Sequence, residues 1–116
     1  MAEPVYKVLS ETAFEEAWAA GRFHGSADDA RDGFIHLSAG DQLAGTLASH
    51  FAGQDGLVLL ALDAGRLGPA LKWEPSRGGA LFPHLYAPLD LAALLWVELL
   101  KLGHDGRHIL PEGVFA

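Results

Sequence analysis

Two short phrases of the sequence are nearly identical: FIHLS at residues 34–38 and FPHLY at residues 82–86. Side chains alternate between the two faces of an extended strand, so in each phrase the first aromatic residue, the histidine and the final hydroxyl residue share one face. If the two segments belong to one sheet, His36, His84, Ser38 and Tyr86 line the same side of it. The repeat therefore favours a sheet with one apolar face and one face suited to a site.

The apolar run at residues 57–62 is typical of a central strand that is buried on both faces. Residues 88–102 favour a helical turn followed by a strand. Further strands and turns are expected at residues 4–9, 70–74, 80–86, 103–106 and 107–110, of which the last two form a hairpin.

Two segments have the signals of helices. Thr12 and Glu15 have the spacing of a capping box, which predicts a first helix that ends at Gly21. Apolar residues recur every four positions from residue 43 to residue 51, so a second helix is expected from Asp41 to a stop at Gly53. Residues 25–33 are polar and rich in Asp, which predicts a loop.

A chain of 116 residues has the length of one ordinary domain. Strands interleaved with two main helices predict a single α+β domain over residues 1–116, built on a curved or split, mostly antiparallel β-sheet. No apolar stretch reaches the roughly 18 residues of a membrane span, and the first ten residues lack a secretory signal. We therefore expect a cytoplasmic protein with no membrane partner.

Composition also excludes several kinds of chemistry. The chain has no cysteine, which rules out disulfides, thiolate catalysis and cysteine-ligated metal sites. Its formal net charge is −7, with only 8 Lys and Arg residues. Nucleic acids are bound chiefly by clustered cations, so no nucleic-acid partner is expected. A small-molecule ligand is favoured.

Histidine exchanges protons near neutral pH, which makes His36 and His84 candidate catalytic residues, although each is equally explained as a packed structural residue. Glu74 is a third catalytic candidate, since a carboxylate in a partly apolar pocket acts as a base or stabilises a cationic transition state. The alternative is a solvated residue at a strand edge. The neighbouring Trp73 is either a stacking surface for a ligand or a core anchor.

Residues 76–79, Ser-Arg-Gly-Gly, are a candidate anion-binding turn in which Arg77 supplies a guanidinium group. An ordinary turn between two strands has the same composition. His104 and His108 have a spacing seen in metal sites, but they straddle the predicted hairpin and no third ligand is indicated.

Three phrases occur in the order DGFIHLS at 32–38, LKWE at 71–74 and GGALFPHLY at 78–86. Together with residues 25–26 and Gln42 they resemble the bacterial family called domain of unknown function 952. The resemblance covers nearly the whole chain. It implies the fold of that family and supplies no established activity.

A more distant resemblance concerns the IHLS phrase at residues 35–38, which is similar to the histidine strand of RNA 2'-phosphotransferases and, through them, to the ADP-ribosyltransferase-like superfamily. That resemblance implies NAD held in a cleft of a split sheet. It further implies that His36 contacts the ribose, that Tyr86 or Trp73 stacks on nicotinamide, and that Glu74 is the acidic residue.

Two positions depart from the phosphotransferase pattern. Those enzymes carry an arginine four residues before the histidine and a second histidine two residues before it, whereas this sequence has Asp32 and Phe34. The loss of these cations argues against recognition of a 2'-phosphate. The negative net charge of the chain also argues against RNA as a substrate.

The leading hypothesis is therefore a small enzyme, or a ligand-binding protein, that acts on NAD or a related ADP-ribosyl compound at the ribosyl C1. Ser38, Gln42, Trp73, Arg77 and Tyr86 are the candidate ligand-binding residues, with NAD as a substrate rather than a resident cofactor. One alternative is a non-catalytic metabolite-binding or protein-interaction module. Another is a metal-dependent enzyme that uses His36, His84 and a carboxylate as ligands.

Overall fold

The computed structural model describes residues 3–114. Its strands, in chain order, are β1 Val5–Ser10, β2 Arg22–Phe23, β3 Ile35–His36, β4 Leu57–Leu62, β5 Leu71–Pro75, β6 Leu81–Leu85, β7 Leu89–Asp90, β8 Leu94–Leu102 and β9 His108–Ile109. The α-helices are α1 Glu11–Ala20, α2 Ala27–Asp32, α3 Leu43–His50 and α4 Ala64–Leu67. Short 3-10 turns are η1 Gly40–Gln42, η2 Gly68–Ala70, η3 Arg77–Gly79 and η4 Leu91–Ala93.

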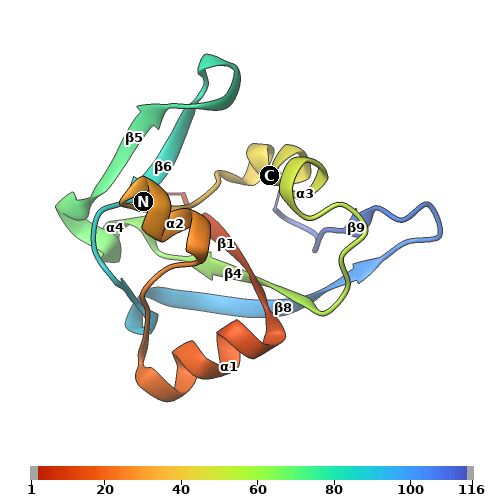
Figure 1. Ribbon diagram of the computed structural model, residues 1–116, viewed down its shortest axis with the longest axis horizontal. Helices are drawn as coiled ribbons and strands as arrows, with labels where there is room; N and C mark the ends of the chain where they lie inside the picture. The colour runs from red at the N-terminus through yellow and green to blue at the C-terminus, as the bar shows by residue number, and fades with distance from the viewer. Residues whose placement is uncertain (1–2, 115–116) are drawn as a thin grey trace.

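The strands form three antiparallel groups, in the orders β1-β4-β8-β9, β3-β6-β5 and β2-β7. An isolated bridge between Tyr6 and Ser38 joins the first two groups, with backbone hydrogen bonds of 2.8 and 2.9 Å. The β5–β6 hairpin projects from the body of the molecule on the side away from α1 (Figure 1). This arrangement confirms a small α+β fold with antiparallel sheets.

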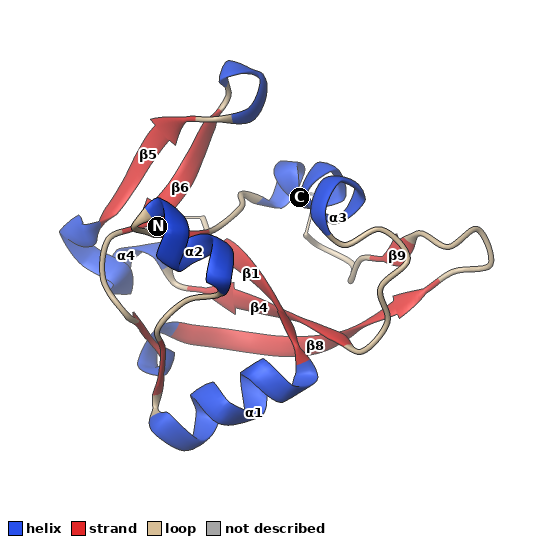
Figure 2. Ribbon diagram, viewed as in Figure 1, coloured by secondary structure: helices blue, strands red, loops and turns tan. Residues whose placement is uncertain are grey.

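The four-stranded sheet is the centre of the core. All six residues of β4 are buried, because alternate side chains enter two different apolar clusters. Val58, Leu60 and Leu62 pack with residues of α1, whereas Leu57 and Leu59 pack with Leu43 and Leu47 of α3. Helices thus cover both faces of the strand that was predicted to be central (Figure 2).

Several local predictions need correction. The N-cap of α1 is Ser10, whose side chain accepts a hydrogen bond from the Ala13 amide, so the spacing of Thr12 and Glu15 does not mark the helix start. The end at Gly21 is confirmed, with φ of 83° in the left-handed region. The second helix begins as the turn η1 and becomes α-helical only at Leu43, and it ends at His50.

The largest correction concerns residues 25–33, where the structure has the helix α2 in place of a loop. Ser26 accepts a hydrogen bond from the Asp29 amide at 3.2 Å, and the Asp29 carboxylate accepts one from the Ser26 amide at 2.8 Å. This reciprocal capping box stabilises a helix that is too short to show an apolar period.

In the described range, no helix is long and apolar enough to span a membrane.

Candidate active site

The two histidine phrases lie side by side in the structure. Strands β3 and β6 are antiparallel neighbours, and His36 is directly opposite His84. The centroids of the two imidazole rings are 5.9 Å apart and the rings meet edge to face. The prediction that the two strands share a sheet is confirmed.

Phe34 occupies the space beside the two imidazoles. Its ring stacks on His84 with centroids 4.0 Å apart, and lies 4.6 Å from the His36 ring and 5.3 Å from the Tyr86 ring. These side chains share a face because residues two apart on a strand point the same way. Phe34 therefore fixes the orientation of His84 by packing.

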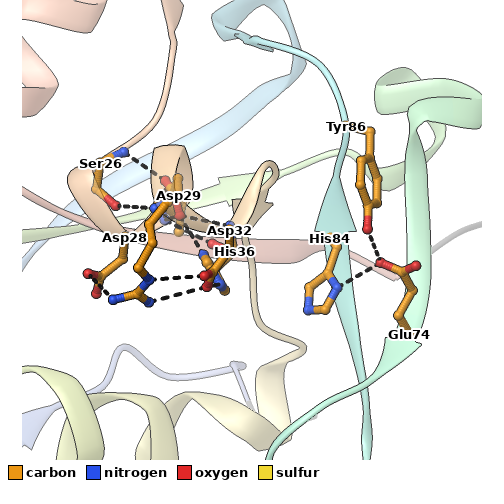
Figure 3. A network of polar contacts seen from close by, with 10 residues as sticks. Ser26, Asp28, Asp29, Asp32, His36, Glu74, His84 and Tyr86 are labelled. Carbon is orange, nitrogen blue, oxygen red and sulfur yellow. Dashed lines mark hydrogen bonds and ion pairs between the residues drawn. The ribbon is translucent and has the colours of Figure 1, made fainter.

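The short helix α2 supplies two carboxylates to His36. Nδ1 of His36 lies 2.7 Å from Oδ1 of Asp29, and Nε2 lies 2.8 Å from Oδ2 of Asp32 (Figure 3). Asp32 also contacts Arg31, whose Nε is 3.0 Å from Oδ1. The hydrogen bond from Arg31 lowers the pKa of Asp32.

Asp29 is a buried carboxylate with several donors. It contacts Nζ of Lys7 at 3.1 Å and accepts hydrogen bonds from the backbone amides of Ser26 and His36 at 2.8 and 3.0 Å. Burial opposes the ionisation of Asp29, but the Lys7 charge and these hydrogen bonds outweigh it and hold its pKa below the ordinary value. Burial lowers the pKa of Lys7, against the pull of Asp29.

Glu74 on β5 organises the other side of the site. Its Oε1 accepts a hydrogen bond from the Tyr86 hydroxyl at 2.6 Å and lies 2.9 Å from Nδ1 of His84 (Figure 3). The hydrogen bonds from Tyr86 and then His84 lower the pKa of Glu74. The hydrogen bond to Glu74 raises the pKa of Tyr86.

A cavity of about 450 Å³ opens beside this network. Its walls come from β1, α2, β3, α3 and the β5–β6 hairpin, and His36 and His84 both line it. Further lining residues that bear on the chemistry are Asp28, Asp32, Ser38, Thr46, Phe51, Ser76 and Phe82. The volume lies in the range typical of small-molecule sites.

The other predicted ligand-binding residues are dispersed. Ser38 lines the cavity and its hydroxyl is 2.8 Å from that of Thr46. Gln42 links η1 to β6, because its side chain accepts from the Ala39 amide at 2.9 Å and donates to the Leu81 carbonyl at 2.7 Å. Trp73 pairs with Pro83 and so points to the face opposite His84, where 46% of it is exposed.

The side chain of Arg77 lies outside the described part of the structure. Glu74 and Tyr86 meet His84 but do not line the cavity. The cavity-lining carboxylates that contact a histidine are those of Asp29 and Asp32, at 2.7 and 2.8 Å from His36. Glu74 contacts the side chain of His84 at 2.9 Å.

The metal alternative finds little support. Among residues 3–114, no group of three or more His, Asp and Glu side chains is arranged to hold a metal ion. Nε2 of His108 is instead 2.7 Å from the Gln54 carbonyl oxygen. The spacing of His104 and His108 therefore reflects the β8–β9 hairpin.

The structure adds Lys7, Asp29 and Asp32 to the site. Two signals were available in the sequence: Ser26 and Asp29 have the spacing of a capping box, and Lys7 is a lone cation in an otherwise apolar strand. The contact between Asp32 and His36 has no such signal, because a turn at Gly33 separates α2 from β3.

Comparisons with known proteins agree with this architecture. The X-ray crystal structure of protein CC0527 from Caulobacter crescentus is 50% identical in sequence, with a TM-score of 0.92, and the match covers 97% of this chain and 99% of that one. The solution NMR structure of CC0527 is 54% identical, with a TM-score of 0.81 and 90% of each chain covered. No curated protein matches the chain. The family model described as protein of unknown function (DUF952) matches residues 8–97, and the chain belongs to that family.

Proposed function

We propose that the cavity binds NAD or a related ADP-ribosyl compound by its ribosyl end, and that the protein acts at the ribosyl C1. The observation that carries the proposal is that His36, His84 and Asp32 line the same cavity, with the two imidazole rings 5.9 Å apart. The resemblance of the His36 strand to the ADP-ribosyltransferase-like superfamily supports the same ligand class.

The chemistry at C1 is suited to this set of groups. When the bond between C1 and the nicotinamide nitrogen breaks, its electron pair neutralises the nicotinamide ring and leaves an oxocarbenium-like ribosyl centre. A fixed carboxylate such as Asp32 stabilises that positive charge. Water or an acceptor hydroxyl then forms the new O–C1 bond, and its proton passes to an imidazole of the cavity wall.

The walls also provide complementary surfaces for the ligand. The hydroxyls of Ser38 and Thr46 lie on the cavity wall with His36, where they can bond ribose hydroxyls. Phe51 and Phe82 provide apolar surface for a flat heterocycle. Trp73 points to the opposite face, so Phe82 replaces it in the proposal as the aromatic residue beside nicotinamide.

Calorimetric titration with NAD, ADP-ribose and nicotinamide tests the binding part of this proposal. We expect binding by the unmodified protein and at least a tenfold weaker affinity for His36→Ala, which corresponds to about 1.4 kcal/mol. His104→Ala is the matched control, because His104 is exposed and does not line the cavity. Absence of heat with all three compounds would remove the proposal.

A second function is favoured by one specific observation. His36 and His84 each contact a carboxylate of the protein itself, and the Phe34 ring packs on His84 with centroids 4.0 Å apart. Histidines held in this way are expected in a rigid site that binds a ligand without converting it. Chromatographic assay of nicotinamide released from NAD separates the two functions. Binding without release supports a metabolite-binding module, whereas release that is lost in His36→Ala and kept in His104→Ala supports the enzyme.

A further inference from the structure

We infer that the two histidines divide the chemistry: neutral His84, oriented by Glu74, presents a bare Nε2 to the cavity as proton acceptor, while His36 is a doubly protonated donor held between two carboxylates. The ionisation states follow from the geometry of the free protein. The catalytic use of His84 rests on the proposed function.

The orientation of His84 fixes which nitrogen carries its hydrogen. Glu74 accepts the Tyr86 hydroxyl hydrogen at 2.6 Å on the same oxygen that lies 2.9 Å from Nδ1 of His84. An ionised carboxylate only accepts hydrogen bonds, so Nδ1 must carry the hydrogen of the second contact. A neutral His84 ring then has its lone pair on Nε2.

Nε2 of His84 has access to the cavity. Within the described residues no hydrogen bond reaches this nitrogen, and no buried side-chain nitrogen or oxygen lacks a partner. Nε2 therefore touches open space, and His84 is one of the cavity-lining residues. The ring extends from Glu74 toward the side of His36 (Figure 3). An oriented imidazole with a free nitrogen facing a cavity is the arrangement of a general base.

His36 is in the opposite situation. Both of its ring nitrogens lie within 2.8 Å of a carboxylate oxygen, from Asp29 and Asp32. A neutral imidazole has a donor on one nitrogen only, so the second contact would place a lone pair against a negatively charged oxygen. Protonation of both nitrogens makes both contacts favourable.

The balance of charge around His36 favours the same state. The surrounding network contains the three carboxylates of Asp28, Asp29 and Asp32, and the two cations of Lys7 and Arg31. A neutral His36 leaves the network with one excess negative charge, while a protonated ring brings it to zero. The side chains of Lys7 and Asp29 are only 10% and 2% exposed, and an uncompensated charge is costly in such surroundings.

The two roles differ in the groups that surround each ring. Glu74 and Lys72 of β5, His36 of β3 and Tyr86 face His84, so its neighbours include one carboxylate and one ammonium group. His36 has two carboxylates in direct contact. The surroundings therefore give His36 and His84 different ionisation states. This is the pattern expected of an acid and base pair.

Long-range proton–nitrogen NMR correlation on the labelled, ligand-free protein at neutral pH tests this inference. We expect the pattern of a neutral ring protonated at Nδ1 for His84, and of a ring protonated at both nitrogens for His36. Protonation of His84 at Nε2, or a neutral His36, would overturn the inference. Because no ligand is present, the outcome is independent of whether NAD binds.

Matched variants identify the groups responsible. Asp32→Asn is expected to return His36 to a neutral ring, while Asp41→Asn leaves it doubly protonated, because Asp41 is exposed, lies outside this charge network and does not line the cavity. Glu74→Gln is expected to remove the preference of His84 for Nδ1, while Tyr86→Phe keeps it, since the carboxylate remains. A preserved NMR spectrum of backbone amides verifies folding of each variant. Unchanged ring signals in folded Asp32→Asn or Glu74→Gln would overturn the inference.

The assay of nicotinamide release tests the catalytic assignment separately. If release occurs, Glu74→Gln should lower its rate at least tenfold and leave the affinity for ADP-ribose unchanged. An equal rate in Glu74→Gln refutes His84 as the proton acceptor while leaving the proposed function intact. If the NMR signals of the rings are as expected but neither the unmodified protein nor any variant releases nicotinamide, the enzymatic function is refuted. The inferred ionisation states then still stand.

Discussion

Replacement of Lys7 with Met tests the buried ion pair between Lys7 and Asp29 beside His36. The side chains of Lys7 and Asp29 are only 10% and 2% exposed, and their nearest charged atoms are 3.1 Å apart. Met occupies a similar volume beside Phe23, whose ring centroid is 5.8 Å from Nζ. The substitution therefore removes the charge while preserving most of the packing.

The expected loss of stability follows from what remains around Asp29. Removing one partner of a buried ion pair costs about 3–5 kcal/mol, because the other charge is left buried. Asp29 keeps the amides of Ser26 and His36 and the His36 ring as donors, so we expect the lower end, about 3 kcal/mol. For a domain of this size that corresponds to a fall in melting temperature of roughly 12 °C.

Urea unfolding followed by circular dichroism measures the change in the free energy of unfolding. Lys101→Met is the control, because Lys101 is exposed and its replacement should stay within about 0.5 kcal/mol. The double variant Lys7→Met with Asp29→Asn should recover part of the loss, since the buried charge is gone, although only one of the amides of Ser26 and His36 keeps its acceptor oxygen. A loss below about 1 kcal/mol in Lys7→Met, the range of surface ion pairs, refutes the argument.

Three further predictions concern other parts of the molecule. Gly40→Ala should destabilise the fold by about 1–3 kcal/mol in urea, because a Cβ there would overlap the backbone carbonyl oxygen of Val114. Glu74→Gln should lower the pKa of Tyr86 toward the ordinary value in an ultraviolet titration, since the hydrogen bond to the carboxylate raises it. The pKa of Asp29 is lower in the folded state, so its stabilising contribution is present above the ordinary aspartate pKa and is lost as pH falls through the folded value. Asp29→Asn should accordingly flatten the loss of stability in acid.

Each of these predictions has a control or a contrary result. Gly65→Ala is the matched control for Gly40, because a Cβ at Gly65 meets only the flexible Asp63 side chain. The phenol of Tyr6 should titrate unchanged in Glu74→Gln, and a shift of both tyrosines would contradict a local effect. An acid-unfolding curve for Asp29→Asn that parallels that of the unmodified protein contradicts the assignment to this carboxylate.

Elements with strong local patterns were predictable from the sequence. The apolar run of β4, the stop of α1 at Gly21 and the hairpins around β6 and β9 follow from burial on two faces, from the left-handed conformation of glycine and from turn composition. The pairing of β3 with β6 was predictable only because the two phrases repeat. A two-residue strand such as β3 would otherwise have too few positions to show a period.

Contacts between distant segments were decided by the tertiary structure. Alternation placed His36 and His84 on one face, but their carboxylate partners depend on where α2 packs and on the register of β5 against β6. Trp73 and Glu74 are adjacent in sequence, and only Glu74 reaches the site, because a one-residue step along a strand changes the face. The two histidines and Glu74 were thus predictable from the sequence, whereas Lys7, Asp29 and Asp32 join the site only because folding brings β1 and α2 beside β3.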